Sequence, residues 1–231
     1  AGGGPRHPFY AMPAGFAKMT RGIGSWGWHT VPQHHMGGMV IRYTQARVLG
    51  GGSSINAQIY TRGNALDYDE WRQLGCEGWA YEDVLPFFRK SEDNDSFNDR
   101  YHGRGGPLGV SKPAAPLPIC EAYFRAAGQL GIPFNPDMTG ATQDGVGYYQ
   151  LTQRKARRSS TSVAFLNPAR RRPNLTVRSG AQVLRIVVEN GRATGIELAG
   201  KAGPERITAD TEVILSAGAI GSPRLLRSEE R

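Results

Sequence analysis

The sequence predicts a mixed α/β (α+β) fold that is incomplete at both ends. A run of β-branched and aromatic residues at 39–43 leads toward a glycine-rich turn, a transition typical of a loop that follows a strand. Amphipathic helical patterns follow up to residue 130, and beyond residue 150 the pattern changes to strands and a hairpin. The chain opens on a turn-like glycine-rich segment at 1–5 without an initiator Met, so we expect part of a larger fold.

The composition is that of a globular protein of ordinary domain size. Of the 231 residues, 39% are hydrophobic and 21% are charged, which excludes a disordered chain. No apolar run approaches the roughly 18–20 residues that a transmembrane helix needs. The only cysteines, Cys76 and Cys120, lack the spacing of a metal site or a disulfide framework and fit a reducing compartment. We therefore expect a cytoplasmic protein without a transmembrane segment, with association at a membrane surface left open.

The formal net charge is +8, with one basic cluster at Arg154, Lys155, Arg157 and Arg158 and another at 170–172. Basic patches of this kind bind nucleic acid or phosphate surfaces in many proteins. Here no recognition-helix or RNA-binding motif accompanies the arginines, and no aromatic residues interleave with them as in a stacking platform. We therefore favour a solvated face and no nucleic-acid partner, with a basic phosphate or nucleic-acid binding module as the alternative.

Residues 5–45 are rich in Gly, His, Met and aromatic residues and carry few helix signals. Residues 26–31 alternate bulky and small side chains like a short strand, which a proline ends. His29, His34 and His35 have no acidic or Cys residues nearby in the sequence, and they indicate loop histidines rather than a metal site.

Gly50, Gly51 and Gly52 predict a loop that opens a helix. Glycines free the backbone, Ser53 or Ser54 is suited to cap the first helical turn, and apolar residues follow at helical spacing. The unpaired N–H groups and the positive dipole end of such a turn suit an anion such as a phosphate. Taken alone, a glycine run is more often a flexible connection. The ordered pattern that follows this one favours a binding loop.

Three helices are predicted downstream of this loop. Residues 67–75 have acidic side chains in the first turn and Gly at the end. Residues 81–91 form a second helical pattern, and residues 118–130 form a third with an apolar face. The polar segment 92–106 between the second and third helices predicts a surface loop.

The last part of the chain has β character. Residues 174–178 predict a short strand and residues 181–189 a longer one. Asn190-Gly191 is the signal of a type I′ hairpin, so residues 192–198 should return antiparallel.

A strand–turn–helix pattern closes the chain. Residues 211–218 predict a buried strand, after which Ser222 is suited to be the N-cap and Pro223 the first helical residue. Such a turn is a second place where a backbone approaches a dinucleotide closely. By pattern alone it is equally an ordinary corner between a strand and a helix.

Residues 46–63 also resemble the first signature of the glucose–methanol–choline (GMC) family of FAD-dependent oxidoreductases. That pattern joins a basic residue, an aliphatic residue, a Gly-Gly pair, small residues and an Asn in a fixed order. Residues 64–71, 78–88 and 218–226 extend the resemblance, from which Glu229-Glu230-Arg231 depart. The positions that meet the first signature are Ala46, Arg47, Leu49, Gly50, Gly51, Gly52, Ser53, Ile55 and Asn56, followed by Tyr60, Gly63 and Asp69.

The resemblance implies a partial FAD-binding Rossmann-type domain with an inserted helical segment and a β-hairpin. Residues 1–231 would be the N-terminal FAD-binding region of such an enzyme, without the Gly-x-Gly-x-x-Gly start and the C-terminal catalytic part. Ile55 stands where some relatives carry a His that links the flavin, so the implied FAD is noncovalent. The implied cofactor-binding positions are Arg47, Val48, Gly50, Gly51, Gly52, Ser53, Asn56, Ala57, Gln58, Ile59, Val183, Ser216, Ala217 and Gly218.

The resemblance further implies oxidation of the CH–OH group of an alcohol, with hydride transfer to flavin N5 and a base in a C-terminal part of the enzyme. It implies no catalytic residue and no metal in this chain, because the five histidines lie in the wrong region: His7, His29, His34, His35 and His102. The motifs are similar to those of choline dehydrogenase-like members, which favours a quinone or another carrier over oxygen as electron acceptor. For the isolated chain we expect a catalytically inert fragment that aggregates.

Overall fold

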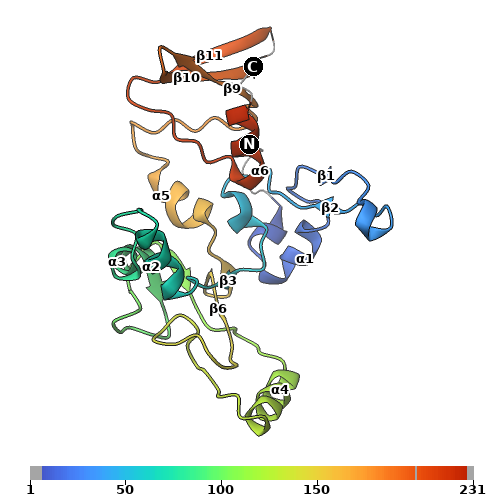
Figure 1. The fold of residues 1–231 in the computed structure, drawn as a ribbon, viewed down its shortest axis with the longest axis vertical. Helices are drawn as coiled ribbons and strands as arrows, with labels where there is room; N and C mark the ends of the chain where they lie inside the picture. The colour runs from blue at the N-terminus through green and yellow to red at the C-terminus, as the bar shows by residue number, and fades with distance from the viewer. Residues whose placement is uncertain (1–6, 201, 228–231) are drawn as a thin grey trace. The chain divides into compact units, whose positions relative to one another are not determined.

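A computed structural model describes residues 7–200 and 202–227. The described residues divide into two compact units, 7–176 and 177–227, and each is a body of its own (Figure 1). Helices and small sheets are mixed in the first unit, whereas the second combines one sheet with one helix. The predicted class of mixed α and β structure is thus confirmed.

The first unit contains short strands in pairs rather than one large sheet. Antiparallel pairs join β1 to β2, β3 to β6 and β7 to β8, and β4 lies parallel to β5. The strands are β1 (Trp28–His29), β2 (Arg42–Tyr43), β3 (Ile59–Tyr60), β4 (Glu92–Asn94), β5 (Leu108–Val110), β6 (Gln150–Leu151), β7 (Gln153–Arg154) and β8 (Arg157–Arg158). The strand predicted at 26–31 is therefore limited to the two residues of β1.

The helices of the first unit include the three that the sequence predicts. These are α2 (Ala65–Gln73), α3 (Tyr81–Ser91) and α4 (Pro118–Gln129). The shorter helical segments are η1 (Pro8–Tyr10), η2 (Pro13–Gly15), α1 (Phe16–Met19), η3 (His34–Met36), η4 (Gly51–Ser54), the π-helix η5 (Ser162–Leu166) and α5 (Asn167–Ala169). Within the described part of the chain, no helix is both long and apolar enough to cross a membrane.

Side-chain caps explain where α2 and α3 begin. Asn64 Oδ1 accepts a hydrogen bond from the Leu66 amide at 2.9 Å, so α2 starts two residues earlier than predicted. The Asp83 carboxylate accepts from the Ala80 amide at 3.1 Å and closes the first turn of α3. Asp69 of α2 accepts from the Tyr81 amide at 3.0 Å, which joins the two helices.

The second unit is built on the predicted hairpin. Strands β9 (Val183–Glu189) and β10 (Arg192–Gly200) pair antiparallel through Asn190 and Gly191, whose φ angles of 52° and 76° fit a type I′ turn. A third strand that the sequence did not predict, β11 (Gly203–Thr208), pairs with β10, so the sheet order is β11-β10-β9. Helix α6 (Gly218–Arg227) follows in the chain (Figure 1).

Three predictions for this part of the chain are wrong. Residues 174–178 and 211–218 are not strands: neither stretch pairs with a strand among the described residues, Ile214 is 78% exposed, and Gly218 is the first residue of helix α6. Helix α6 begins at Gly218, so Ser222 lies inside it and accepts a hydrogen bond from the Ala217 amide at 3.0 Å. A run of apolar residues is a strand only where a neighbouring strand takes its hydrogen bonds.

A small apolar core in the first unit lies beside the glycine run. Met19, Val48 and Ile55 are buried against one another, and partly buried aromatic and aliphatic side chains pack around them. Val48 precedes the glycines and Ile55 follows them, so this cluster holds both ends of the loop. Burying side chains of this size contributes about 1.5–3 kcal/mol each.

Candidate functional site

The glycine run forms a tight loop and not the start of an α-helix. Gly50 and Gly51 have φ angles of 89° and 54°, and the turn η4 ends at Ser54. Ser53 Oγ donates to the Gly50 carbonyl at 2.6 Å, and Ser54 Oγ donates to the Leu49 carbonyl at 2.8 Å. The helix predicted from Ser53 or Ser54 is therefore wrong, because both hydroxyls close the loop behind them instead of capping N–H groups ahead.

The chain beyond the loop also departs from helical geometry. Gln58 has a φ angle of 68°, which interrupts any helix, and strand β3 begins at the next residue. A four-residue 3-10 turn has no extended dipole, so the argument for anion binding at a helix N-terminus does not apply here. Another property of the loop has to account for any ligand.

That property is an open edge at Gly51 and Gly52. A Cβ atom added to either residue would meet nothing within 4 Å. A Cβ atom on Gly50, by contrast, would lie 2.4 Å from Ser54 Oγ and 3.0 Å from Ser162 Cβ. Gly50 is thus required by packing, whereas Gly51 and Gly52 leave bare backbone that a flat or extended ligand could approach closely.

The remaining predicted residues of this segment divide by burial. Val48 and Gln58 are buried, whereas Arg47, Asn56 and Ala57 are exposed and Ile59 is half exposed. The Arg47 guanidinium lies over the Trp26 ring, 4.6 Å from its centroid. The buried residues help to fix the shape of the loop. The exposed ones are close to Gly51 and Gly52 in the sequence.

A second segment, which the sequence analysis assigned to a basic surface cluster, holds the loop in place. Arg158 is 3% exposed, and its Nη1 donates to the Ser53 carbonyl at 3.1 Å, the Asn56 carbonyl at 2.8 Å and Asn56 Oδ1 at 2.9 Å. Thr161 adds a hydrogen bond from its amide to Ser53 Oγ at 2.9 Å and one from Oγ1 to the Gly50 carbonyl at 3.2 Å. In the sequence, the positive charge of Arg158 gives no indication that this residue is buried.

The same region contains buried polar atoms without a hydrogen-bond partner among the described residues. They are Nε and Nη2 of Arg158, Nε2 of Gln58 and Oγ of Ser162. Burial lowers the pKa of Arg158 to about 10, so its guanidinium stays charged at neutral pH. Unpaired buried donors are costly, and they are typical of places where a further group completes the site.

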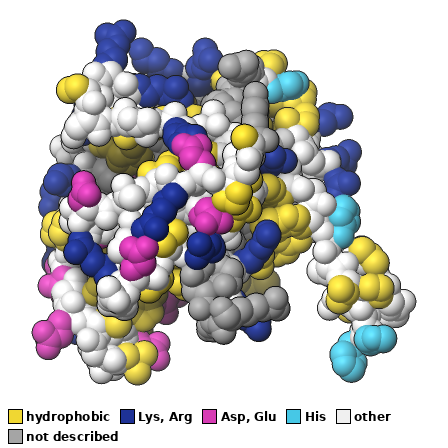
Figure 2. Space-filling model, turned by 90° about the horizontal axis from the view of Figure 1, so that it is seen from above, with side chains coloured by type: hydrophobic (Ala, Val, Ile, Leu, Met, Phe, Trp, Pro, Cys, Tyr) yellow, Lys and Arg dark blue, Asp and Glu magenta, His cyan; other side chains and the backbone are white. Residues whose placement is uncertain are grey.

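Two members of the predicted basic cluster at 154–158 are not free surface cations. Arg158 is buried, and Arg154 pairs with Asp93 at 2.8 Å. On the face shown in Figure 2, acidic side chains lie beside basic ones. The structure therefore gives no support to a basic nucleic-acid binding module.

The other predicted cofactor residues belong to the second unit. Val183 opens β9 and is partly buried opposite Leu198 of β10. Ser216 and Ala217 lie in extended chain and are exposed, and Gly218 opens α6 with a φ angle of 84°. These positions and the glycine loop thus lie in separate units.

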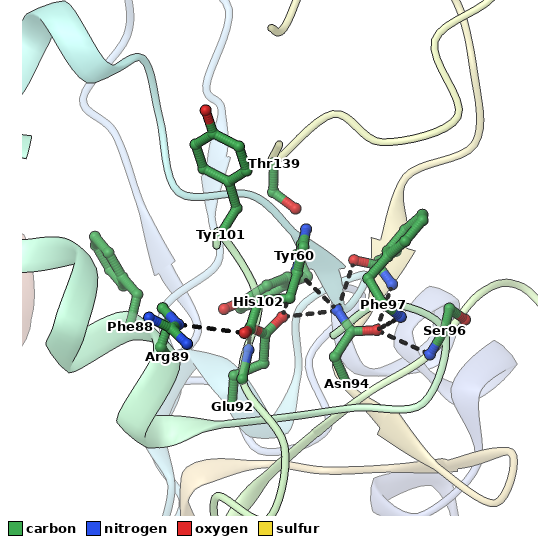
Figure 3. A network of polar contacts seen from close by, with 12 residues as sticks. Tyr60, Phe88, Arg89, Glu92, Asn94, Ser96, Phe97, Tyr101, His102 and Thr139 are labelled. Atoms are coloured by element: carbon green, nitrogen blue, oxygen red, sulfur yellow. Dashed lines mark hydrogen bonds and ion pairs between the residues drawn. The ribbon is translucent and has the colours of Figure 1, made fainter. Parts of the chain in front are cut away.

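A buried polar network in the first unit corrects the prediction of a surface loop at 92–106. Glu92, Asn94 and His102 are 0%, 1% and 0% exposed. Their side chains lie together in Figure 3, where dashed lines mark their polar contacts. Glu92 Oε2 pairs with Arg62 Nη2 at 2.5 Å, and its Oε1 accepts from Asn94 Nδ2 at 2.8 Å. Asn94 and Gln150 exchange two hydrogen bonds of 3.0 Å. A polar composition usually indicates an exposed loop, but in this segment the polar groups form hydrogen bonds with one another inside the fold.

His102 is the cation at the centre of this network. Its Nε2 lies 2.9 Å from Asp137 Oδ2 and its Nδ1 lies 3.2 Å from Glu92 Oε1. Burial lowers the pKa of His102, but the hydrogen bonds and charges of Asp137 and Glu92 outweigh it and raise the pKa to about 9. Asp99, His102 and Asp137 offer ligand atoms within 4.8 Å of one another, and in this arrangement His102 Nε2 is paired directly with Asp137 Oδ2.

The network connects strands that follow the glycine loop in the chain, and its ion pairs and hydrogen bonds hold them together. It links β4, through Glu92 and Asn94, to Gln150 of β6, which pairs with Tyr60 of β3. Strand β3 follows the glycine loop directly in the chain. The network thus fixes the downstream end of the candidate site.

Comparison with known proteins decides the family. The model of the GMC oxidoreductase family, in its N-terminal domain, matches residues 17–229. The chain belongs to the GMC oxidoreductase family. The GMC chain is 40% identical over 227 residues to an oxygen-dependent choline dehydrogenase of Sinorhizobium fredii, covering 97% of this chain and 41% of the relative. It is 41% identical over 202 residues to the mitochondrial choline dehydrogenase of Mus musculus, covering 87% and 34%.

Solved structures share the fold of this GMC chain. Pyridoxine 4-oxidase from Mesorbium loti superposes with a TM-score of 0.91 at 32% identity, over 98% of this chain and 45% of the other. An FAD-dependent oxidoreductase from Chaetomium thermophilum gives a TM-score of 0.90 at 28% identity, over 98% and 42%. The chain spans about two fifths of the length of the curated relatives it matches, 41% and 34% in the two cases above.

Proposed function

We propose that this GMC chain is the N-terminal FAD-binding region, over residues 1–231, of an enzyme that oxidises the CH–OH group of an alcohol. The single observation that carries the proposal is the open backbone edge at Gly51 and Gly52, inside the region that the family model matches. Family membership and relatives named choline dehydrogenase support the reaction class. The base that takes the hydroxyl proton would lie in a part of the enzyme outside this chain.

The residues of the loop fit a flavin dinucleotide by their chemistry. Bare backbone at Gly51 and Gly52 admits close approach, and the unpaired donors of Arg158 and Gln58 are suited to a site completed by a polar or anionic group. Bound there, FAD would supply the hydride acceptor. The proposed cofactor contacts of the first unit are Arg47, Val48, Gly50, Gly51, Gly52, Ser53, Asn56, Ala57, Gln58 and Ile59. For the second unit, taken by itself, the proposed cofactor contacts are Val183, Ser216, Ala217 and Gly218.

The roles of these residues differ with their burial. The side chains of Val48 and Gln58 are buried, so they act by shaping the loop. Arg47 and Asn56 are exposed, and Asn56, whose Oδ1 already accepts from Arg158 and Gln58, would meet a ligand through its Nδ2. Ile55 carries no nucleophile and is packed in the core with Met19, so the proposed FAD is held noncovalently.

The substrate class we propose is a small alcohol of the choline type. For the electron acceptor we propose a quinone or another carrier, and the names of relatives that depend on oxygen make oxygen the second candidate. Free thiols at Cys76 and Cys120 support a cytoplasmic location, with peripheral membrane attachment as the variant to test by cell fractionation.

The proposal is tested on the full-length enzyme that contains this chain. Purified enzyme is assayed with choline, benzyl alcohol and a medium-chain alcohol, once with a quinone analogue or redox dye and once with oxygen alone. We expect flavin-dependent oxidation of at least one alcohol, faster with the dye. Purified protein without flavin, or flavoprotein inert toward every alcohol and acceptor, would contradict the proposal.

A further inference from the structure

Arg158 is a buried cation that has no acidic partner among the described residues. Among the described residues, its side-chain hydrogen bonds all run from Nη1, to three oxygens of Ser53 and Asn56. Arg62, the other buried arginine of this unit, is by contrast neutralised by Glu92 at 2.5 Å. A hydrophobic side chain of similar volume would fill the space of Arg158 without the desolvation cost. Packing alone therefore does not explain a guanidinium at this position.

The hairpin that carries Arg158 binds the loop segment at both of its ends. Strands β7 and β8 form a hairpin whose turn residues, Lys155 and Ala156, have φ angles of 51° and 56°. Gln153 of β7 lies opposite Arg158 in the ladder and donates from Nε2 to Gln58 Oε1 at 3.1 Å. Arg158 thus holds the segment at Ser53 and Asn56, while Gln153 holds it at Gln58.

We propose that Arg158 is a positioning residue of the flavin site, which fixes Ser53 and Asn56 so that the edge at Gly51 and Gly52 faces the cofactor. This inference rests on the proposed function. Asn56 Oδ1 accepts from both Arg158 Nη1 and the Gln58 amide, the latter at 3.1 Å, so the guanidinium holds Asn56 in the position from which it binds the Gln58 amide. The turn amides that depend on it include Ile55 and Asn56, which both donate to the Gly52 carbonyl.

The test compares three variants of the full-length enzyme. Arg158→Met removes the charge and the donors at similar volume, and Arg158→Lys keeps a charged donor. Arg157→Met is the matched control, because Arg157 is the preceding residue of β8 and is exposed. Two quantities are measured: the Kd for FAD, from flavin fluorescence on titration of apoenzyme, and the hydrogen exchange of the amides of Ile55, Asn56 and Gln58.

For Arg158→Met we expect the Kd for FAD to rise about tenfold to a hundredfold, the loss expected for charge-assisted hydrogen bonds. The three amides should exchange about tenfold faster. Arg158→Lys should recover most of the affinity, and Arg157→Met should match the wild type in both measurements. Rescue by Lys separates positioning from simple packing, because Met fills the same space.

Each outcome is decisive. Wild-type FAD affinity and exchange in Arg158→Met would overturn the inference while leaving the proposed function intact. Wild-type protein that binds no FAD would overturn the proposed function instead. If Arg158→Met does not fold, Arg158→Lys is compared with Arg157→Met: a small loss of FAD affinity with faster exchange at Asn56 in Arg158→Lys alone would support the inference, and equal affinity and exchange in the two variants would overturn it.

Discussion

Nε2 of His102 lies 2.9 Å from Oδ2 of Asp137, and the imidazole is completely buried. Since the other ring nitrogen faces Glu92, the histidine is held as a cation between two carboxylates. The pKa of His102 is raised to about 9 from an ordinary 6.5, and the pKa values of Glu92 and Asp137 are lowered. Folding is therefore linked to the protonation of this group.

The first prediction concerns stability against pH. A raised folded-state pKa contributes stability that is complete below the unfolded pKa of 6.5 and is lost as the pH rises through about 9. The melting temperature of the enzyme should thus fall between these two pH values. In His102→Gln the melting temperature should be lower than that of the wild type at low pH, and it should not show this fall between the two pH values. Parallel pH curves for wild type and His102→Gln, measured by thermal unfolding, would show that the histidine is not a buried cation.

The second prediction compares two acidic residues. Glu92→Gln leaves Arg62 and His102 as buried cations with fewer partners, so it should destabilise the fold by about 3–5 kcal/mol. The matched control is Glu82→Gln, which breaks an exposed ion pair with Arg100 and should cost less than about 1 kcal/mol. Urea unfolding measures both values. Equal losses of unfolding free energy in the two variants would mean that the network around Glu92 contributes no more to stability than an exposed ion pair.

The third prediction separates the two kinds of glycine in the loop. Gly50→Ala should impair folding, because its Cβ would lie 2.4 Å from Ser54 Oγ and its φ angle is 89°. Gly52→Val should fold normally, since open space surrounds this residue and its φ angle is not positive, yet it should lower the bound flavin. The measurements are the melting temperature and the ratio of flavin to protein after gel filtration. Full flavin occupancy in Gly52→Val would show that the open edge does not face the cofactor.

Particular residues show why the sequence predicts some of this structure and misses the rest. Helices α2 and α3 and the β9–β10 hairpin follow from local patterns, among them the acidic first turn of α2 and the Asn190-Gly191 turn, although the Asn64 cap starts α2 two residues before the predicted position. The hydroxyls of Ser53 and Ser54 fit a helix cap equally well, and only the fold shows that they donate backward. A local pattern predicts the structure correctly where neighbours within a few residues decide it. It fails where, as at Ser53 and Ser54, those neighbours allow two hydrogen-bond arrangements.

The larger errors come from partners far away in the sequence. Residues 211–217 have strand composition but no pairing partner among the described residues. Glu92, His102 and Arg158 were assigned to the surface because they are charged, and they are buried because Arg62, Asp137 and Asn56 meet them. Burial of a charge depends on such long-range pairing, which no local pattern reveals.

The fourth prediction concerns the attachment of the flavin. Ile55 offers no nucleophile and is buried in the apolar core, so denaturation should release the cofactor. Acid precipitation of the loaded enzyme should leave a colourless pellet and a yellow supernatant. Colour that stays in the pellet would show a covalent bond to another residue and would remove the noncovalent assignment.

The central claim, that this chain forms part of an FAD-dependent alcohol oxidoreductase, is tested most directly by anaerobic mixing. The flavin-loaded full-length enzyme is mixed without oxygen with choline, benzyl alcohol or a medium-chain alcohol, and the visible flavin absorbance is followed in a stopped-flow instrument. Residues 1–231 alone serve as the control, and they should show neither flavin absorbance nor dye reduction. The account predicts bleaching of the flavin by at least one alcohol, with the aldehyde or ketone as product. Flavin that stays oxidised with every alcohol, or bleaching by residues 1–231 alone, would contradict it.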